Sequence, residues 1–221
     1  MKVFCVIPAY NEEKTIEKVV REVKFYVDKV VVVDDGSVDQ TSYLAQKSGA
    51  IVLRHLINRG QGAALETGNQ YALSKGADII VHFDADGQFL AREILEVITP
   101  IKKGEAQIVF GSRFLEKKSH IPWFKKNIII PLAHLANKIF IGKSLSDPQS
   151  GFRALSRTAA QKIKIEQDDM AHCSEIIYKA FSNQLKIKEV PITVIYHDFG
   201  QRFLSGIKII KDLILGLLIK L

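Results

Sequence analysis

The sequence predicts an α/β fold in which helices cover both faces of a mostly parallel central sheet. Short runs rich in Val and Ile alternate along the chain with segments of helical periodicity, and the connections between them are short. A length of 221 residues, 47% of them hydrophobic, suffices to bury the core of one domain. We therefore expect a single domain over residues 1–221.

The alternation is clearest in the first half of the chain. Strands are expected at Val3–Ile7, Lys29–Val33, Ala50–Arg54, Asp78–Phe83 and Gln107–Gly111. Helices are expected at Glu12–Tyr26 with Asn11 as the N-cap, at Thr41–Ser48, at Ala63–Ser74 and at Arg92–Lys102. The second half is less regular, and predicts helices at Asn127–Ile141 and Cys173–Asn183 and a strand at Lys186–Ile195.

The net charge of +7 is distributed unevenly. Residues 1–110 carry 13 Lys and Arg against 15 Asp and Glu, whereas residues 111–221 carry 18 against 9. The basic half is suited to an anionic partner, although a solvated basic surface explains the charge equally well.

Cysteine content and hydropathy bear on the compartment. Cys5 and Cys173 are too few for a disulfide framework or a zinc site, which favours a reducing compartment. The N-terminal apolar run is broken by Pro8 and followed by acids, so we interpret it as a strand and not as a signal peptide. No apolar run reaches the roughly eighteen residues needed to cross a bilayer.

Acidic residues follow three of the predicted strands, in "IPAYNEE", "VVVDDGSVDQT" and "FDADGQ". The carboxyl ends of parallel strands share one edge of the sheet, so Asp34, Asp35, Asp84 and Asp86 should gather there. If the last strand continues through this stretch, Asp84 and Asp86 point to the same side of it. A turn is the usual interpretation of a single D-x-D. Three acidic strand ends favour Mg²⁺ or Mn²⁺ bound with a nucleotide diphosphate.

The stretch "NRGQGAALETG", residues 58–68, opens a helix with glycines after a strand. It lacks the Gly-Lys-Ser/Thr of a P-loop and the third glycine of a dinucleotide fingerprint. We interpret Gly60 and Gly62 as a turn that lets the helix lie close to the sheet, in preference to direct ligand contact.

These motifs together resemble those of the family 2, GT-A-type glycosyltransferases, and within them the dolichol-phosphate mannose synthase-like polyprenyl-phosphate glycosyltransferases. The resemblance rests on "IPAYNE" (7–12), "VVDDGSVDQT" (32–41), "NRGQGAALETG" (58–68), "FDADGQ" (83–88), "GSR" (111–113), "SDPQSGFR" (146–153), "EVPI" (189–192) and the pair Arg202 and Lys208. It implies a GT-A fold whose residues 1–111 bind the nucleotide sugar and whose residues 112–221 bind the acceptor.

The resemblance also implies site residues. The base and ribose would be held by Pro8, Tyr10, Glu12, Val33 and Asp35, and the ribose-diphosphate and metal by Asp84, Ala85 and Asp86, with Gln88 as a further metal ligand. Phosphate groups of donor or acceptor would be bound by Arg113, Arg202 and Lys208. Arg153 either binds phosphate or pairs with an acid.

The expected reaction is metal-dependent sugar transfer that inverts the anomeric centre, with Asp86, Asp147 and Arg113 as catalytic residues. A lipid phosphate acceptor is already ionised near neutral pH, whereas a hydroxyl acceptor would require a general base. Asp147 is the candidate for that base or for organising the acceptor site, and a cap or turn role is its alternative.

The second half of the chain also suggests a lipid partner. Residues 127–141 and 206–221 are predicted amphipathic helices that associate with the cytoplasmic face of a membrane, with core packing or dimerisation as the alternative. The expected partners are a nucleotide sugar of the GDP-mannose or UDP-glucose type, a polyprenyl phosphate and the membrane surface, but no nucleic acid. A membrane-anchoring subunit or a homo-oligomer is compatible with this interpretation.

Three alternatives stay open at this point. A family 2 enzyme could act on a glycan or glycolipid hydroxyl. A sugar-nucleotide pyrophosphorylase would have a glycine-rich loop after the first strand, where "IPAYNEE" has no glycine. A non-catalytic basic module would leave the clustered aspartates unexplained.

Overall fold

The computed structural model describes residues 1–115 and 145–195. The predicted helices at 127–141 and 206–221 lie outside the described residues, as do Arg202 and Lys208. Within the part of the chain that the structure describes, no helix is long and apolar enough to span a membrane.

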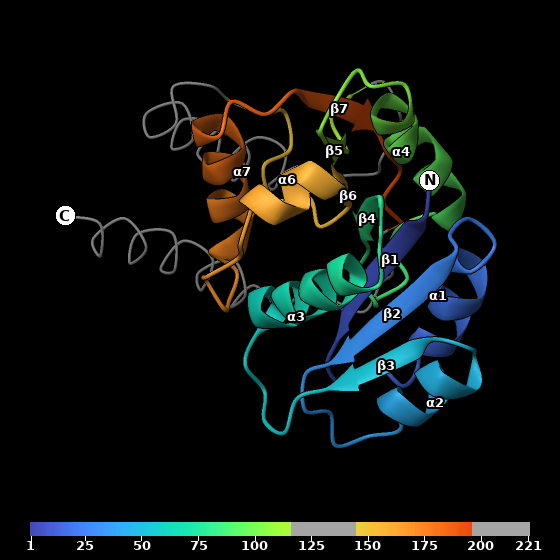
Figure 1. Cartoon of the computed structure of the whole chain (residues 1–221). Helices are drawn as coiled ribbons and strands as arrows, with labels where there is room; N and C mark the ends of the chain where they lie inside the picture. Colours follow the sequence, from blue (N-terminus) through green and yellow to red (C-terminus); the bar gives the residue numbers. More distant parts are fainter. Residues whose placement is uncertain (116–144, 196–221) are drawn as a thin grey trace.

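A seven-stranded sheet with the order β3-β2-β1-β4-β6-β5-β7 forms the centre of the fold (Figure 1). Its strands are β1 (Val3–Ala9), β2 (Lys29–Asp34), β3 (Ile51–Arg54), β4 (Ile79–His82), β5 (Ile108–Ser112), β6 (Arg153–Ser156) and β7 (Ile187–Pro191). Every neighbouring pair is parallel except those of β6, which runs antiparallel to β4 and β5. The predicted α/β fold with a mostly parallel sheet is confirmed.

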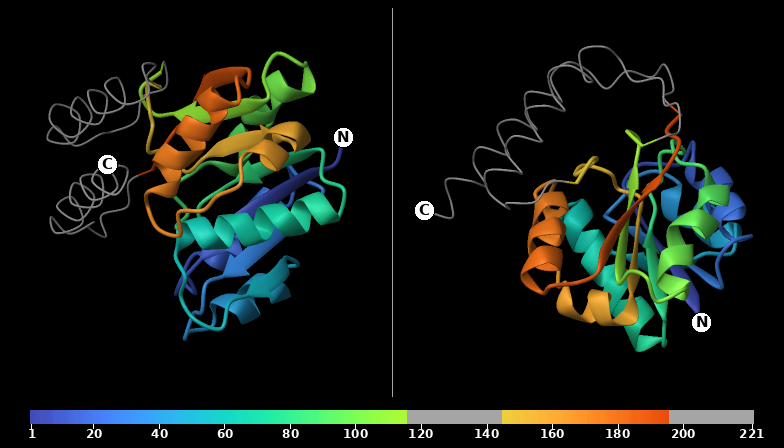
Figure 2. Two further views of the ribbon diagram at one scale, coloured as in Figure 1. Left: turned by 60° about the vertical axis from the view of Figure 1, so that its left-hand side comes forward. Right: turned by 90° about the horizontal axis from the view of Figure 1, so that it is seen from above.

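Helices cover both faces of this sheet, as Figure 2 shows. The helices α1 (Ile16–Val23), α2 (Thr41–Lys47) and α4 (Ile94–Lys102) lie on one face, the last preceded by the short 3-10 helix η1 (Ala91–Glu93). The opposite face carries α3 (Gln61–Ser74), α6 (Arg157–Lys162) and α7 (His172–Ser182).

Each face of the sheet has its own hydrophobic core. Along β1 the buried side chains alternate, because successive residues of a strand point to opposite faces. Cys5 and Ile7 pack in the cluster that contains α1 and α4, whereas Phe4 and Val6 pack in the cluster that contains α3, α6 and α7. Burial on both faces explains why the central strands are continuous apolar runs.

Several predicted boundaries differ from the structure. The first helix begins at Ile16 and not at Glu12, and Asn11 does not cap it. Asn11 instead has φ 56° and accepts a hydrogen bond from Val38 N at 3.0 Å, so it belongs to a loop contact. The strand expected at Lys186–Ile195 ends at Pro191, and β6 and α6 were not predicted.

The topology brings the functional motifs to one edge. The strands β1, β2, β4 and β5 all run in the same direction, so their carboxyl ends share that edge. The reversed β6 begins there, with Arg153 in register between His82 of β4 and Phe110 of β5. The predicted gathering of polar strand ends at one edge is confirmed.

Candidate active site

Asp34, the last residue of β2, stabilises the turn that follows the strand. Its carboxylate accepts hydrogen bonds from Ser37 N at 2.8 Å and from the Ser42 hydroxyl, and Arg54 Nε lies 3.6 Å away. The side chain is fully buried. Asp34 thus stabilises the loop in which the next acid is presented.

Asp35 is held by the loop that follows β3. Its carboxylate accepts hydrogen bonds from Gly60 N at 2.7 Å and Arg59 N at 3.0 Å, and His55 Nδ1 lies 2.6 Å from Oδ1. The second ring nitrogen of His55 contacts Thr67 Oγ1 at 2.9 Å, which fixes the orientation of the imidazole. The motifs at 32–41 and 58–68 therefore form one structural unit, and Asp35 stays a predicted ribose or base ligand.

The glycines of the 58–68 motif make different contacts from those expected. A Cβ at Gly60, where φ is 104°, would lie 2.4 Å from Asp168 O, and one at Gly62 would lie 2.0 Å from Gln167 O. Both glycines therefore have the predicted packing role, but they admit the backbone that precedes α7 and do not bring the helix close to the sheet. Gly68 is the residue that does so, because its Cβ would lie 2.2 Å from a methyl group of Val6.

The loop after β1 lies beside the β2 loop and contributes Glu12. The Glu12 amide donates to Thr41 Oγ1 at 2.8 Å, and Thr15 donates to the Glu12 carboxylate at 2.9 Å. Burial raises the pKa of Glu12, and the negative charge of Asp86 adds to this effect. Glu12 and Asp86 are thus close enough to sense each other's charge.

The other residues predicted to hold the base border the same place. Pro8 of β1 and Val33 of β2 are paired in register, one residue before Ala9 and Asp34. Tyr10 follows β1 and is 48% exposed, so its ring is available to a ligand. Their contacts with a base stay predictions.

The D-x-D stretch forms a loop beyond the end of β4. Asp84 and Asp86 lie after the last strand residue, His82, so our premise that a strand places them on one side is wrong. The loop is closed at its base by the rings of Phe83 and Phe89, whose centroids lie 5.6 Å apart in an edge-on arrangement. This contact fixes both ends of the loop.

Within the loop the two carboxylates have separate donors. Gln61 Nε2 donates to Asp84 Oδ1 at 3.0 Å, and Gln88 N donates to Asp86 Oδ1 at 3.0 Å. Gly151 lies against the remaining oxygen, since a Cβ there would approach Asp84 Oδ2 to 2.4 Å. Glycine at position 151 therefore leaves space beside Asp84 Oδ2.

Burial and the neighbouring charge of Asp86 raise the pKa of Asp84 to about 7, while Arg153 opposes the shift. A carboxyl group with a raised pKa ionises less readily. A bound cation would offset the repulsion between the charges of Asp84 and Asp86. The local environment of Asp84 therefore suits a bound cation better than a permanently unpaired carboxylate.

This shift predicts a stability effect. Because the folded pKa is raised, ionisation of Asp84 lowers the free energy of unfolding as the pH rises from about 4 to about 7. Metal-free Asp84→Asn should therefore be about 1–3 kcal/mol more stable than the wild type at pH 8 and equal to it near pH 4. Urea unfolding in EDTA measures both values. The control is Asp78→Asn, since the Asp78 side chain is half-exposed at the other end of β4. Equal stability of wild type and Asp84→Asn at pH 8 would contradict this account.

Arg153 occupies an interior position behind the D-x-D loop. Only 1% of it is exposed, and its Nη2 donates to Ser150 O at 2.8 Å and to Cys173 Sγ at 3.3 Å. Its positive charge lowers the pKa of Asp84. The structure thus places Arg153 where it acts electrostatically on the D-x-D carboxylate, and phosphate binding by it stays a prediction.

Arg113 and Asp147 form a two-pronged ion pair beyond β5. Arg113 Nε lies 2.7 Å from Asp147 Oδ2 and Nη2 lies 2.7 Å from Oδ1, and the Arg113 amide also donates to Oδ2. Asp147 is 1% exposed, whereas the Arg113 side chain is 23% exposed. Of the roles considered for Asp147, this geometry favours organising Arg113 over acting as a base.

Hydrogen bonds also join the motifs around this pair. The Ser112 and Ser146 hydroxyls lie 2.6 Å apart, and Ser146 donates from both its amide and its hydroxyl to Glu189 Oε1, at 2.7 and 2.6 Å. The stretches "GSR", "SDPQSGFR" and "EVPI" thus meet at a single point. Because β6 separates β4 from β5, Arg113 and the D-x-D loop follow strands that are not direct neighbours in the sheet.

Sequence reasoning missed several polar residues of the site, above all Gln61, His55, His172 and Cys173. A signal for His55 exists, because it directly follows β3 at the same edge as the aspartates. Cys173 contacts Arg153, and His172 contacts Cys173, through chain packing that has no local sequence signal.

The donor set at the edge fits a hard divalent cation. No group of three or more His, Cys, Asp or Glu side chains is arranged as a complete metal site among residues 1–115 and 145–195. Asp84 and Asp86 do supply carboxylate oxygens, and a diphosphate would supply the remaining ligands that Mg²⁺ or Mn²⁺ takes.

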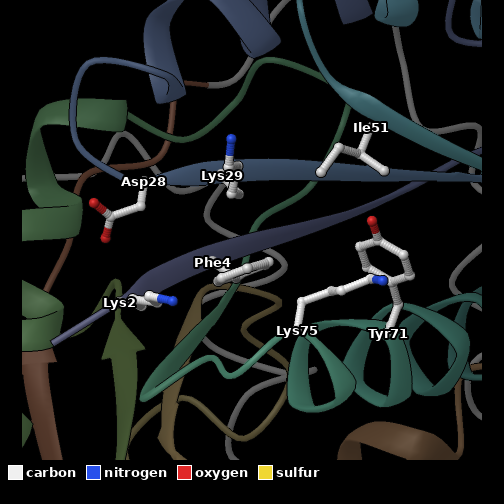
Figure 3. Close-up of a pocket in the computed structure, with 7 residues that line it drawn as sticks. All are labelled: Lys2, Phe4, Asp28, Lys29, Ile51, Tyr71 and Lys75. Carbon is white, nitrogen blue, oxygen red and sulfur yellow. The ribbon is translucent and has the colours of Figure 1, made fainter.

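A pocket of about 290 Å³ lies at the opposite end of the sheet (Figure 3). Figure 3 shows its lining at the starts of β1, β2 and β3 and along the last turns of α3: Lys2, Phe4, Asp28, Lys29, Ile51, Tyr71 and Lys75. None of the predicted site residues lines it, so the acidic edge is the candidate active site.

Similarity to known proteins agrees with this geometry. The Glycosyl transferase family 2 model matches residues 4–164. The chain is 34% identical to the UDP-N-acetylglucosamine–dolichyl-phosphate N-acetylglucosaminyltransferase of Methanococcus voltae, over 96% of this chain and 95% of that protein. It is 28% identical to the polyprenol monophosphomannose synthase of Mycolicibacterium smegmatis, over 91% of this chain and 80% of that protein.

Among solved structures, the fold is similar to that of glucosyl-3-phosphoglycerate synthase from Mycobacterium tuberculosis in complex with Mn²⁺, uridine-diphosphate-glucose and phosphoglyceric acid. The TM-score is 0.72 at 24% identity, over 93% of this chain and 74% of that chain. The family model matches most of the chain, and the chain has a GT-A fold with acidic strand ends. The chain therefore belongs to glycosyl transferase family 2 and is a glycosyltransferase.

Proposed function

We propose that this glycosyltransferase moves one sugar from a nucleotide sugar to a polyprenyl phosphate at the cytoplasmic face of a membrane, with a divalent metal ion. The observation that carries the proposal is the separation of charge along one sheet edge. Asp84 and Asp86 lie beyond the end of β4, whereas the partly exposed guanidinium of Arg113 lies beyond the end of β5, with β6 between the two strands. Relatives that are named as dolichyl-phosphate and polyprenol transferases support the lipid acceptor.

On the donor side, the chain binds and orients the nucleotide. Glu12 and Asp35 are carboxylates that can accept hydrogen bonds from base or ribose, and Tyr10 can cover the base. A divalent ion between Asp84, Asp86 and the diphosphate, with Gln88 as a further ligand, would neutralise charge that builds on the leaving phosphate. Ala85, which is 4% exposed between the two acids, stays a predicted contact of the ribose-diphosphate.

On the acceptor side, Arg113 attracts and positions an anionic phosphate. Asp147 holds the guanidinium by two hydrogen bonds, so little conformational freedom is lost when a phosphate binds. A phosphate oxygen that is already ionised attacks without a general base, which agrees with the engagement of Asp147 by Arg113. Attack opposite the departing diphosphate inverts the anomeric centre.

The proposal is tested by transfer of labelled sugar from a panel of UDP- and GDP-sugars. One set of reactions contains a polyprenyl phosphate, a second contains a glycolipid with only hydroxyl acceptors, and a third contains water alone. We expect a lipid-linked product from the first set that depends on Mg²⁺ or Mn²⁺. Transfer to the hydroxyl acceptor alone would favour the alternative family 2 activity and overturn the lipid phosphate assignment.

Arg113→Lys tests the acceptor side. Lysine keeps the positive charge but loses the two-pronged geometry, so we expect the KM for polyprenyl phosphate to rise about 10-fold to 100-fold while the KM for the donor is unchanged. The control is Arg157→Lys, because Arg157 bonds Ala77 O away from the site. Equal acceptor KM values in Arg113→Lys and the wild type would remove Arg113 from phosphate binding.

A further inference from the structure

Two large apolar side chains project from the loop between β3 and α3. Leu56 is fully exposed and Ile57 is 71% exposed. They stand next to each other in the stretch "RHLINRG", between Arg54 and Arg59. Val38, in the neighbouring loop after β2, is 90% exposed. We call Val38, Leu56 and Ile57 the apolar tip.

The backbone beneath the apolar tip is held in place on both sides. His55 N donates to Asp34 O at 2.9 Å, and Arg59 N donates to the Asp35 carboxylate. A Cβ at Gly36 would lie 2.8 Å from the carbonyl carbon of Ile57, so the two loops are in close contact. Arg54 Nη2 also donates to Ser37 O at 2.8 Å. The exposure therefore belongs to a fixed loop conformation.

The position of the apolar tip identifies its occupant. The tip lies at the carboxyl edge of the sheet, in the same loops that hold Asp35, so whatever covers it also faces the donor side of the active site. Arg54 and Arg59 are exposed beside it. Exposed apolar side chains flanked by arginines complement a bilayer that contains anionic lipids.

We propose that Leu56 and Ile57, supported by Val38, insert into the interfacial region of an anionic bilayer and place the donor site at a fixed height above it. The inference rests on the proposed function, because it supposes that the acceptor is embedded in that bilayer. Insertion confines the enzyme to the membrane surface, so that its search for the acceptor is two-dimensional. The hydrogen bonds from the loop to Asp35 couple the depth of the loop to the donor site.

The test compares Leu56→Ser/Ile57→Ser with Phe25→Ser. Phe25 is 85% exposed at the end of α1, on the opposite edge of the sheet, and provides a matched loss of exposed apolar surface. Binding to vesicles of phosphatidylcholine with phosphatidylglycerol is measured by co-sedimentation. We expect the double variant to bind about tenfold or more weakly and Phe25→Ser to bind as the wild type does. Equal binding of all three proteins, or no binding by the wild type, would overturn the inference.

Activity separates this inference from the proposed function. Transfer is measured to a polyprenyl phosphate in vesicles and to a short-chain, water-soluble polyprenyl phosphate. We expect the double variant to lose about tenfold in kcat/KM on vesicles and to equal the wild type on the soluble acceptor. If the double variant matches the wild type on both acceptors, the docking inference fails alone. If the wild type uses neither acceptor, the proposed function fails.

Discussion

Asp86→Ala is expected to reduce sugar transfer by about a thousandfold or more, because it removes a carboxylate from the proposed metal and diphosphate site. The loop itself should persist, since Phe83 and Phe89 close its base independently of Asp86. The free energy of unfolding should therefore change by no more than about 1 kcal/mol. Initial rates of transfer with saturating donor, together with urea unfolding, measure both quantities.

The matched control for Asp86→Ala is Asp78→Ala. Asp78 precedes β4 at the other end of the strand, where it is 45% exposed and accepts a hydrogen bond from Lys2 N. It should retain transfer within about twofold of the wild type. Full activity of Asp86→Ala in the presence of EDTA would contradict the assignment of Asp86 as a metal ligand.

Gly60→Ala is expected to destabilise the protein by about 3–4 kcal/mol and to impair donor binding as well. The backbone at Gly60 has φ 104°, and a Cβ would lie 2.4 Å from Asp168 O, which is a main-chain atom that cannot rotate away. Any shift that relieves the clash also moves Gly60 N, which donates to Asp35. Urea unfolding and nucleotide binding should therefore change together.

Gly76→Ala is the control that separates the backbone strain of a positive φ from the steric clash at Gly60. Gly76 has a similar positive φ of 79°, but a Cβ there would meet no atom within 4 Å. It should cost only about 1 kcal/mol of backbone strain and leave nucleotide binding unaltered. If Gly60→Ala and Gly76→Ala lose the same stability, the contact between Gly60 and the 167–169 backbone is not a constraint.

The edge on which the site forms could be predicted from the sequence because parallel strands end on a common side. The acids after β1, β2 and β4 needed only the alternation of strands and helices to be placed together. The reversed strand β6 was missed because it has four residues and begins with Arg153, a residue that is rarely buried. Its direction is nevertheless what brings the 146–152 stretch to the site.

Individual roles within the site were harder to predict, because they depend on contacts between distant segments. Adjacent Asp34 and Asp35 look alike in the sequence, yet one holds a turn and the other meets the β3–α3 loop. The pairing of Arg113 with Asp147 joins residues 34 positions apart. The backbone of Gln167 contacts Gly62, although β4, β5 and β6 lie between the two residues in the sequence.

The central claim is that the carboxylates of the D-x-D loop hold a nucleotide diphosphate through a divalent ion. Isothermal titration of the wild type with UDP and GDP, in Mn²⁺ and again in EDTA, tests this claim most directly. The account predicts that at least one nucleotide binds in Mn²⁺, that its affinity falls about 100-fold or more in EDTA, and that Asp86→Ala in Mn²⁺ resembles the wild type in EDTA. Nucleotide binding of equal strength in Mn²⁺ and EDTA would contradict it.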